Sequence, residues 1–149
     1  LTTGYFRQPE VTAAAFKDGW YRSGDGGYRD ADGYFYIVDR VKDMIVSGGE
    51  NVYSTEVEQA IQKLPGIQMC AAVGLPDEKW GERVVAVIVK DPAVSISSDQ
   101  VIGHCRNLIA GYKVPKQVEF VDALPMTPSG KVMKRALREK LLSDTSATD

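Results

Sequence analysis

A chain of 149 residues, 44% hydrophobic and 26% charged, has room for one folded domain and a flanking piece, and this composition excludes a disordered chain. No apolar run approaches the ~18 residues of a membrane span, so no integral membrane segment is expected. The formal net charge of -2 gives no bulk attraction to nucleic acid or to an anionic membrane, so nucleic acid is not an expected partner.

The N-terminal part of the chain predicts a helix followed by β structure. Residues 10–16 predict a short helix entered through Pro9, and residues 20–29 predict a strand. The sequence DADG at 30–33 is a turn signal, and the aromatic and β-branched run at 34–38 completes a hairpin. The first four residues, LTTG, form neither an initiator nor a secretory leader and predict a cut through a longer protein.

A short charged stretch at residues 39–43 joins two apolar segments without glycine or proline. Because it lacks the composition of a flexible linker, we expect a domain boundary that acts as a hinge. The predicted division is residues 1–40, a domain over 41–143, and a frayed tail over 144–149.

The second part of the chain predicts a compact α+β unit. Strands at 44–46 and 51–53 flank a Ser-Gly-Gly-Glu turn and predict a short β-hairpin. The later elements are a helix capped by Ser54, strands at 67–75 and 84–89, a helix capped by Ser98, a strand at 118–121 and a basic helix at 132–142. The expected fold is a small domain in which this hairpin and a mixed three-stranded sheet pack with helices.

Three segments carry the functional signal: YRSGD at 21–25, DRVKDMIVSGGENV at 39–52 and LPMTPSGKV at 124–132. Their order and spacing resemble the last three core motifs of the adenylate-forming superfamily, from about Gly4 to Leu142. That superfamily includes acyl-CoA synthetases, luciferases and the adenylation domains of peptide synthetases. The resemblance implies that residues 1–40 end a large N-terminal adenylating domain and that residues 41–143 are a mobile C-terminal domain.

The resemblance implies an acid–thiol ligase, an AMP-forming acyl-CoA synthetase of fatty acid metabolism. A carboxylic acid and ATP, accompanied by Mg²⁺, would give an acyl-adenylate, and CoA would then displace AMP. The superfamily's phosphate loop and acyl pocket are absent from these residues, so the fragment alone is expected to be inactive and does not name the acid. The alternatives are an adenylation domain that loads a carrier protein and a stand-alone α+β binding module.

Three residues are implied to bind the nucleotide. The Asp25 carboxylate accepts two hydrogen bonds at once, which suits the ribose diol, and the alternative is a turn aspartate. The Arg40 guanidinium offers a fork of donors for ribose or phosphate oxygens. Ile37 falls where the family packs an apolar side chain beneath the sugar and base, and the alternative is hairpin core. Gly26 and Gly27 replace the family's usual apolar residue after the aspartate and are expected to loosen the strand.

Lys131 is the expected catalytic residue. Attack of a carboxylate on the α-phosphate brings negative charges together, and an ammonium stabilises that charge as it develops. The loop that contains Pro125, Pro128, Ser129 and Gly130 is expected to deliver and withdraw this lysine, as in the family. The alternative is a surface charge in front of a basic helix.

Lys42 occupies the family's hinge position, and the alternative is a solvated linker lysine. Gly48, Gly49 and Glu50 belong to the hairpin that lines the pantetheine tunnel in the family. Luciferases carry a functional lysine just before this turn, where this chain has Val46, which argues against the light-emitting branch.

Four further residues match segments that contact the CoA nucleotide in some CoA ligases: Trp80, Tyr112, Lys113 and Lys116. An aromatic ring stacks on adenine and lysines meet phosphates. The alternative is a loop tryptophan and a solvated basic turn. Val114 replaces a basic residue found in some aryl-CoA ligases, so fewer phosphate contacts are expected.

No metal site is expected from the remaining polar residues. Cys70 and Cys105 lack metal-ligand spacing and are interpreted as buried thiols in a reducing compartment, which predicts a cytoplasmic location. The lone His104 is interpreted as structural or as a surface residue.

Overall fold

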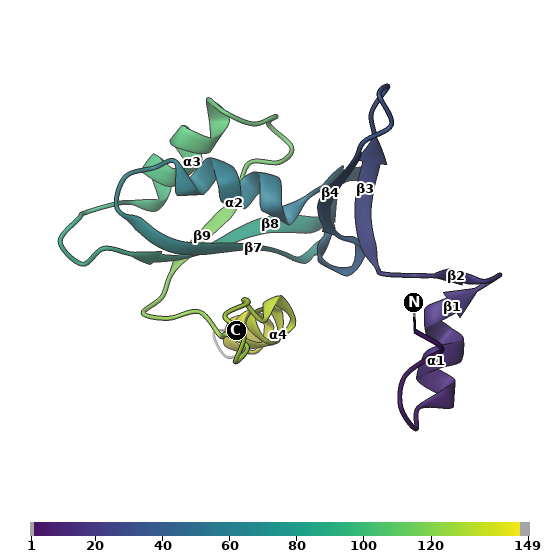
Figure 1. Cartoon of the computed structure of the whole chain (residues 1–149). Coiled ribbons are helices and arrows are strands. Elements are labelled where there is room, and N and C mark those ends of the chain that lie inside the picture. Colours follow the sequence, from purple (N-terminus) through teal and green to yellow (C-terminus); the bar gives the residue numbers. More distant parts are fainter. Residues whose placement is uncertain (1, 147–149) are drawn as a thin grey trace. The chain divides into compact units, whose positions relative to one another are not determined.

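The computed structural model describes residues 2–146, and the chain divides into two compact units, Leu1–Lys42 and Asp43–Asp149. Figure 1 shows the elements of each unit in the colours of the sequence. The division falls two residues after the boundary predicted at residue 40.

The first unit contains a helix and two small antiparallel pairs of strands. These elements are α1 (Pro9–Ala15), β1 (Phe16–Lys17) paired with β2 (Trp20–Tyr21), and β3 (Asp25–Arg29) paired with β4 (Phe35–Arg40). The prediction of one strand over 20–29 is wrong, because Gly24 adopts a φ of 76° and turns the chain between β2 and β3. The predicted hairpin is present, and its turn is closed by the Asp30 amide, which donates to the Tyr34 carbonyl at 3.0 Å.

One mixed sheet forms the centre of the second unit. Its strands are β5 (Ile45–Ser47), β6 (Glu50–Val52), β7 (Ile67–Asp77), β8 (Gly81–Lys90) and β9 (Gln117–Phe120). The order is β6-β5-β8-β7 with antiparallel neighbours, and β9 pairs in parallel with β8. The predicted α+β class is confirmed. The hairpin of β5 and β6 joins β8 through the pair Ser47 and Gly81, so the sheet has five strands instead of three.

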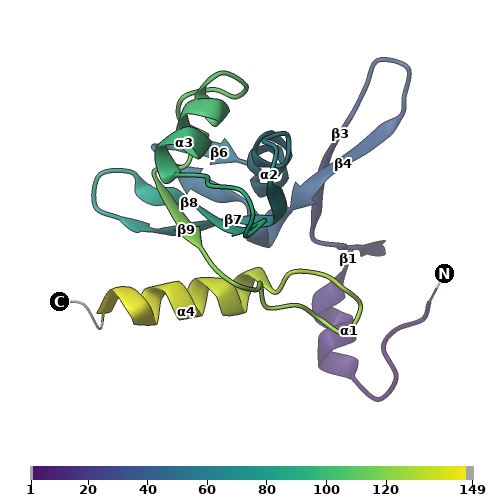
Figure 2. The same cartoon turned by 90° about the vertical axis from the view of Figure 1, so that its left-hand side faces the viewer.

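Helices cover both faces of this sheet, as Figure 2 shows. Helices α2 (Ser54–Gln62) and α3 (Ser98–Arg106) pack on one face, and α4 (Lys134–Ser146) packs on the other. Neighbouring residues of one strand therefore enter different cores: Val84 and Ala86 lie under α2 and α3, whereas Val85 packs with Leu137 of α4. Because both faces are covered, β8 is a continuous apolar run without polar alternation.

Two helix starts differ from the predictions by one residue. The cap of α3 is Ser97 and not Ser98: its hydroxyl accepts from the Gln100 amide, and the Gln100 side chain accepts from the Ser97 amide. The N-cap of α2 is Tyr53, and the predicted cap Ser54 is the first helical residue, with a fully buried side chain.

The last helix begins two residues later than predicted and is longer. It continues through Ser146 into the predicted tail, of which residues 147–149 lie outside the described range. Within the part of the chain that the structure describes, no helix is long and apolar enough to cross a membrane.

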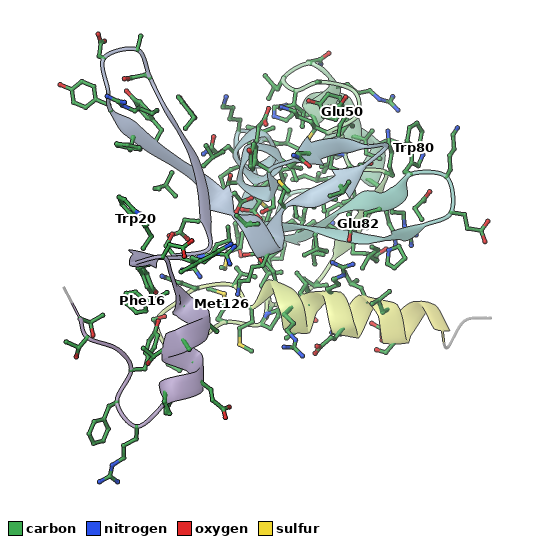
Figure 3. The ribbon with its side chains drawn as sticks, turned by 90° about the vertical axis from the view of Figure 1, so that its right-hand side faces the viewer. Phe16, Trp20, Glu50, Trp80, Glu82 and Met126 are labelled. Atoms are coloured by element: carbon green, nitrogen blue, oxygen red, sulfur yellow. The ribbon has the colours of Figure 1, made fainter. Side chains whose placement is uncertain are left out.

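Glu82, labelled in Figure 3, joins separate parts of the second unit. Its Oε2 accepts from the Val46 amide of β5 at 3.0 Å, and its Oε1 accepts from the Arg138 guanidinium of α4 at 2.7 Å. The ladder between β5 and β8 consists of a single pair, so this carboxylate holds an amide beyond the end of the ladder. The side chain crosses Gly74 of β7, where an added Cβ would lie 2.8 Å from Glu82 Oε2.

Candidate functional site

The predicted nucleotide residues Asp25 and Arg40 contact each other. They lie opposite in the antiparallel register of β3 and β4, and Arg40 Nε is 2.9 Å from Asp25 Oδ1. The Asp25 side chain is 29% exposed and the Arg40 side chain 52%, so the pair remains open to solvent. A carboxylate held in this way keeps accepting capacity for a diol, while the guanidinium keeps donors for further oxygens.

The two glycines after Asp25 accompany an irregularity in the ladder. The register shifts between Gly26, which pairs with Asp39, and Gly27, which pairs with Ile37. A Cβ at position 27 would collide with the Tyr36 carbonyl oxygen, so glycine is required there. The Gly26-Gly27 pair, which departs from the family pattern, thus forms a β-bulge directly after Asp25, the predicted ribose ligand.

Ile37 is 72% exposed on β4, so it packs in no core within the described chain, and its role beneath the nucleotide stays a prediction. Aromatic side chains of the same hairpin are also exposed: Phe35 by 79%, with Tyr28 and Tyr36 stacked at a centroid distance of 5.0 Å. The hairpin therefore presents apolar groups to solvent in this unit. Such an exposed apolar surface is typical of one that another part of a longer chain covers.

Lys42 lies at the junction of the two units, in the short 3₁₀ helix η1 (Val41–Asp43). Its side chain is exposed. The residue before it is held on the first unit, because the Val41 amide donates to the Gly24 carbonyl at 2.9 Å. The predicted hinge is thus a single short turn with few residues available to absorb a change of torsion.

The predicted glycine turn is the two-residue loop of the hairpin between β5 and β6. Gly48 and Gly49 have φ values of 63° and 82°, which glycine adopts without steric cost. The Gly48 amide donates to the Trp80 carbonyl at 2.8 Å, and a Cβ at Gly48 would lie 3.0 Å from the Trp80 indole. An added Cβ at Gly49 would meet open space. The hairpin thus packs against Trp80 on one side, and Figure 3 shows Glu50 and Trp80 at the same end of the sheet.

Two lysines flank the ring of Trp80. Lys79 Nζ lies 4.8 Å and Lys116 Nζ 5.6 Å from the ring, which remains 37% exposed. The loop is fixed by Asp77, whose Oδ1 accepts the amides of Lys79 and Trp80 at 3.0 Å each. The structure therefore brings together Gly48, Trp80 and Lys116 from three segments, and it adds Lys79, which was missed although it directly precedes Trp80.

Lys113 does not join this cluster in the described structure. Its ammonium donates to both carboxylate oxygens of Glu56 at 2.7 Å, and this hydrogen bonding raises the pKa of Lys113 above its ordinary value. Lys113 Nζ also lies 5.5 Å from the ring of its neighbour Tyr112, which is 38% exposed. Lys113 therefore ties the loop before β9 to the first turn of α2, and its role as a CoA ligand stays a prediction.

Lys131 is exposed in a closed loop, next to the turn formed by residues 127–130. Its amide donates to Thr127 Oγ1 at 3.0 Å, and its carbonyl accepts from the Thr127 amide at 2.7 Å. The Met126 and Val132 pair forms a bridge, and the Met133 amide donates to the Pro125 carbonyl. The loop expected to deliver and withdraw the lysine is hydrogen-bonded across its width, which fixes the Lys131 backbone relative to Thr127, and its movement stays a prediction.

The remaining candidate groups are structural. Burial raises the pKa of the Cys70 thiol to about 12, and Cys105 is buried on the inner face of α3, so neither is a reactive thiolate. His104 Nε2 lies 3.0 Å from the Ala60 carbonyl and links α3 to α2. Among the described residues, no cluster of three His, Cys, Asp or Glu side chains forms a metal site.

Helix α4 makes two ion pairs with other elements, and neither was predicted from the sequence. Lys134 pairs with Glu58 of α2, and Arg138 pairs with Glu82 of β8, each at 2.7 Å. The local signal was a helix that begins with two basic residues, against the preference for acids in the first turn.

Comparison with known proteins connects these groups to one family. Residues 56–131, which run from the acid that binds Lys113 to the exposed Lys131, match the family described as AMP-binding enzyme C-terminal domain. The chain belongs to this family. The match includes Trp80, Lys116 and the closed loop as far as Lys131, so the AMP-binding enzyme C-terminal domain covers most of the second unit.

Relatives of this C-terminal domain extend the likeness to almost the whole chain. A feruloyl-CoA synthase from Amycolatopsis sp is 50% identical over 137 residues, and a long-chain-fatty-acid–CoA ligase from Mycobacterium tuberculosis is 49% identical over 140 residues. These matches cover 92% and 94% of this chain but 28% of each relative. ATP-bound MatB from Rhodopseudomonas palustris has a TM-score of 0.85 at 42% identity, over 93% of this chain and 28% of that one. The chain thus spans about 28% of the proteins it resembles.

Proposed function

We propose that this chain is the C-terminal part of an ATP-dependent acyl-CoA synthetase, an acid–thiol ligase that forms an acyl-adenylate and transfers the acyl group to CoA. The observation that carries the proposal is the half-exposed ring of Trp80 between two lysines, beside the Gly48-Gly49 hairpin. A ring face and two ammonium groups suit the adenine and phosphates of CoA. The relatives named as CoA ligases support the same reading.

The loading of a carrier protein has weaker support. A pantetheine arm attached to a protein carries no adenosine, so it would leave the ring and the lysines of the Trp80 cluster without a ligand. The curated relatives reported above are CoA ligases.

In the first half-reaction, we assign Asp25 and Arg40 to the ribose and Ile37 to the apolar face of sugar and base. Lys131 stabilises the negative charge that develops when the carboxylate attacks the α-phosphate. ATP brings Mg²⁺ with it, and residues of the N-terminal domain are assigned to bind the triphosphate and the acid.

In the second half-reaction, the domain swings at Lys42. The Gly48-Gly49 hairpin with Glu50 lines the pantetheine path, because Gly49 leaves open space where any side chain would project. Trp80 and Lys116 bind the CoA nucleotide. We also assign Tyr112 and Lys113 to CoA binding, for which the Lys113 ammonium would exchange the Glu56 carboxylate for a phosphate.

The partner of residues 1–40 is the large N-terminal domain of the same protein, which would cover exposed groups such as Phe35 and Trp20. Residues 41–143 are the mobile domain in this proposal. We assign the enzyme to the cytoplasm, since ATP and CoA are its proposed co-substrates and its two cysteines are free thiols.

The isolated 149-residue chain is expected to catalyse no ATP–pyrophosphate exchange. It holds Lys131, Asp25 and Arg40 but no phosphate loop and no acyl pocket. The measurement uses the purified chain with ATP, Mg²⁺, labelled pyrophosphate and a panel of carboxylic acids. Exchange above background would contradict the division of the active site between two domains.

Trp80→Ala in the complete enzyme is expected to raise the KM for CoA by about 5- to 150-fold, because stacking on an adenine is worth roughly 1–3 kcal/mol. The KM for pantetheine, which lacks the adenosine, should stay unchanged, and so should ATP–pyrophosphate exchange. Trp80→Phe keeps an aromatic face and serves as the matched control, with a near-normal KM for CoA. An equal rise for CoA and pantetheine would show that Trp80 supports the hairpin and does not bind adenine.

A further inference from the structure

Helix α4 begins against the usual electrostatic preference. Its first turn contains Lys134 and Arg135 and no acidic residue, although the N-terminus of a helix carries partial positive charge. In the structure, each of these two cationic side chains forms an ion pair with a glutamate. Arg135 pairs with Glu139 on the exposed side of the helix, whereas Lys134 turns toward the sheet.

Lys134 is held by two acceptors at the outer edge of the sheet. Its Nζ lies 2.7 Å from Glu58 Oε1 and 2.5 Å from Ser54 Oγ, both on α2. Glu58 Oε1 also accepts from the Ala72 amide of the edge strand β7 at 2.9 Å. The side chains of Lys134 and Glu58 are only 16% and 20% exposed. Lys134 thus reaches past β7 and connects the helices on the two faces of the sheet.

The loop that carries Lys131 leads directly into this end of α4. The loop is closed by its own hydrogen bonds, so it follows its support. That support consists of Leu124 and Val132, which pack in the core under α4, and of Lys134, the first residue of the helix. Among the contacts described above that tie this segment to another helix or strand, the pair of Lys134 with Glu58 is the polar one nearest in sequence to Lys131.

We propose that Lys134, held by Glu58 and Ser54, is a positioning residue that sets the place of the Lys131 ammonium during adenylate formation. The inference rests on the proposed role of Lys131. Lys134 itself touches no reacting atom, because its ammonium is occupied by α2.

Lys134→Met in the complete enzyme is expected to lower the kcat of ATP–pyrophosphate exchange by about 10- to 100-fold, since small misplacements of a catalytic group have effects of this size. Thioester formation from supplied acyl-adenylate should change by less than about threefold, because that step does not use Lys131. Lys134→Arg keeps the charge and the donors and should recover most of the lost exchange.

Arg135→Met is the matched control, with the same change of charge one residue further along, on a side chain that is 91% exposed. It should leave both half-reactions unchanged. The double variant Glu58→Gln with Lys134→Met leaves no unpaired buried charge, so it keeps the test valid if Lys134→Met alone unfolds. Its loss of exchange should be smaller than the product of the two single losses.

Equal losses of both half-reactions in the folded double variant, together with a lower Tm, would overturn the proposal and leave Lys134 a purely structural residue. Normal exchange in Lys134→Met, with a selective defect in Lys131→Ala, would overturn this inference alone. Equal half-reaction losses in Lys131→Ala would overturn the role of Lys131 and this inference with it.

Discussion

Lys131→Ala in the complete enzyme is expected to reduce adenylate formation by about 100- to 1,000-fold, the usual effect of removing one group that stabilises charge in a transition state. Thioester formation from supplied acyl-adenylate should be nearly normal. The difference arises because the negative charge that the ammonium stabilises develops only in the first step. ATP–pyrophosphate exchange and a single-turnover thioester assay measure the two steps separately.

The structure supplies a matched control for this experiment. Lys140 lies on the exposed side of the same helix, further from the loop, and Lys140→Ala removes the same charge. It should leave both steps unchanged. A comparable loss in the two half-reactions of Lys131→Ala would remove the assignment of Lys131 to adenylation.

Lys42→Pro is expected to leave adenylate formation within about threefold of normal and to lower thioester formation by roughly 100-fold, because a hinge residue governs the step that needs domain movement. Proline fixes φ near −65°, which matches the φ of about −50 to −70° of a 3₁₀ turn at position 42 itself. It also disfavours the helical conformation of the preceding residue, Val41, in η1, so the Tm of the variant is measured beside its activity. The hairpin at Gly48 and Gly49 would then no longer be brought to the acyl-adenylate.

Lys42→Ala separates the side chain from the backbone in this test. It removes the ammonium but leaves the torsions free, so both half-reactions should stay close to normal. Equal effects of alanine and proline would assign the role to the charge of Lys42 and not to its torsion. Full thioester activity in Lys42→Pro would remove the hinge from the mechanism.

Local patterns in the sequence were sufficient to predict most of the helices and strands. Val57, Ala60 and Ile61 recur at helical spacing, and all three are buried on α2. The cap of α3 was misplaced by one residue although the Ser-x-x-Gln signal of a capping box starts at Ser97 and ends at Gln100. The break at Gly24 was missed because aromatic residues before it favoured a continuous strand.

The contacts that organise the candidate site are long-range and were not predicted from spacing. Lys134 and Ser54 are separated by 80 positions, and Lys113 and Glu56 by 57. No periodicity links residues so far apart, because they meet only after the sheet and both helical layers have formed. Lys113 is the clearest example. Its motif predicts a residue that binds CoA, whereas in the folded chain its ammonium pairs with the Glu56 carboxylate.

The crossing of Glu82 over Gly74 restricts how this domain is able to evolve. A side chain at position 74 would occupy the place of the carboxylate, which binds both the Val46 amide and Arg138. Positions 74 and 82 should therefore vary together among proteins with this domain, with glycine at 74 wherever 82 is glutamate. A side chain at 74 would also lie 2.9 Å from Ile45 Cγ2, so a lineage that gains one must change residues 45 and 82 and find a new acceptor for Arg138.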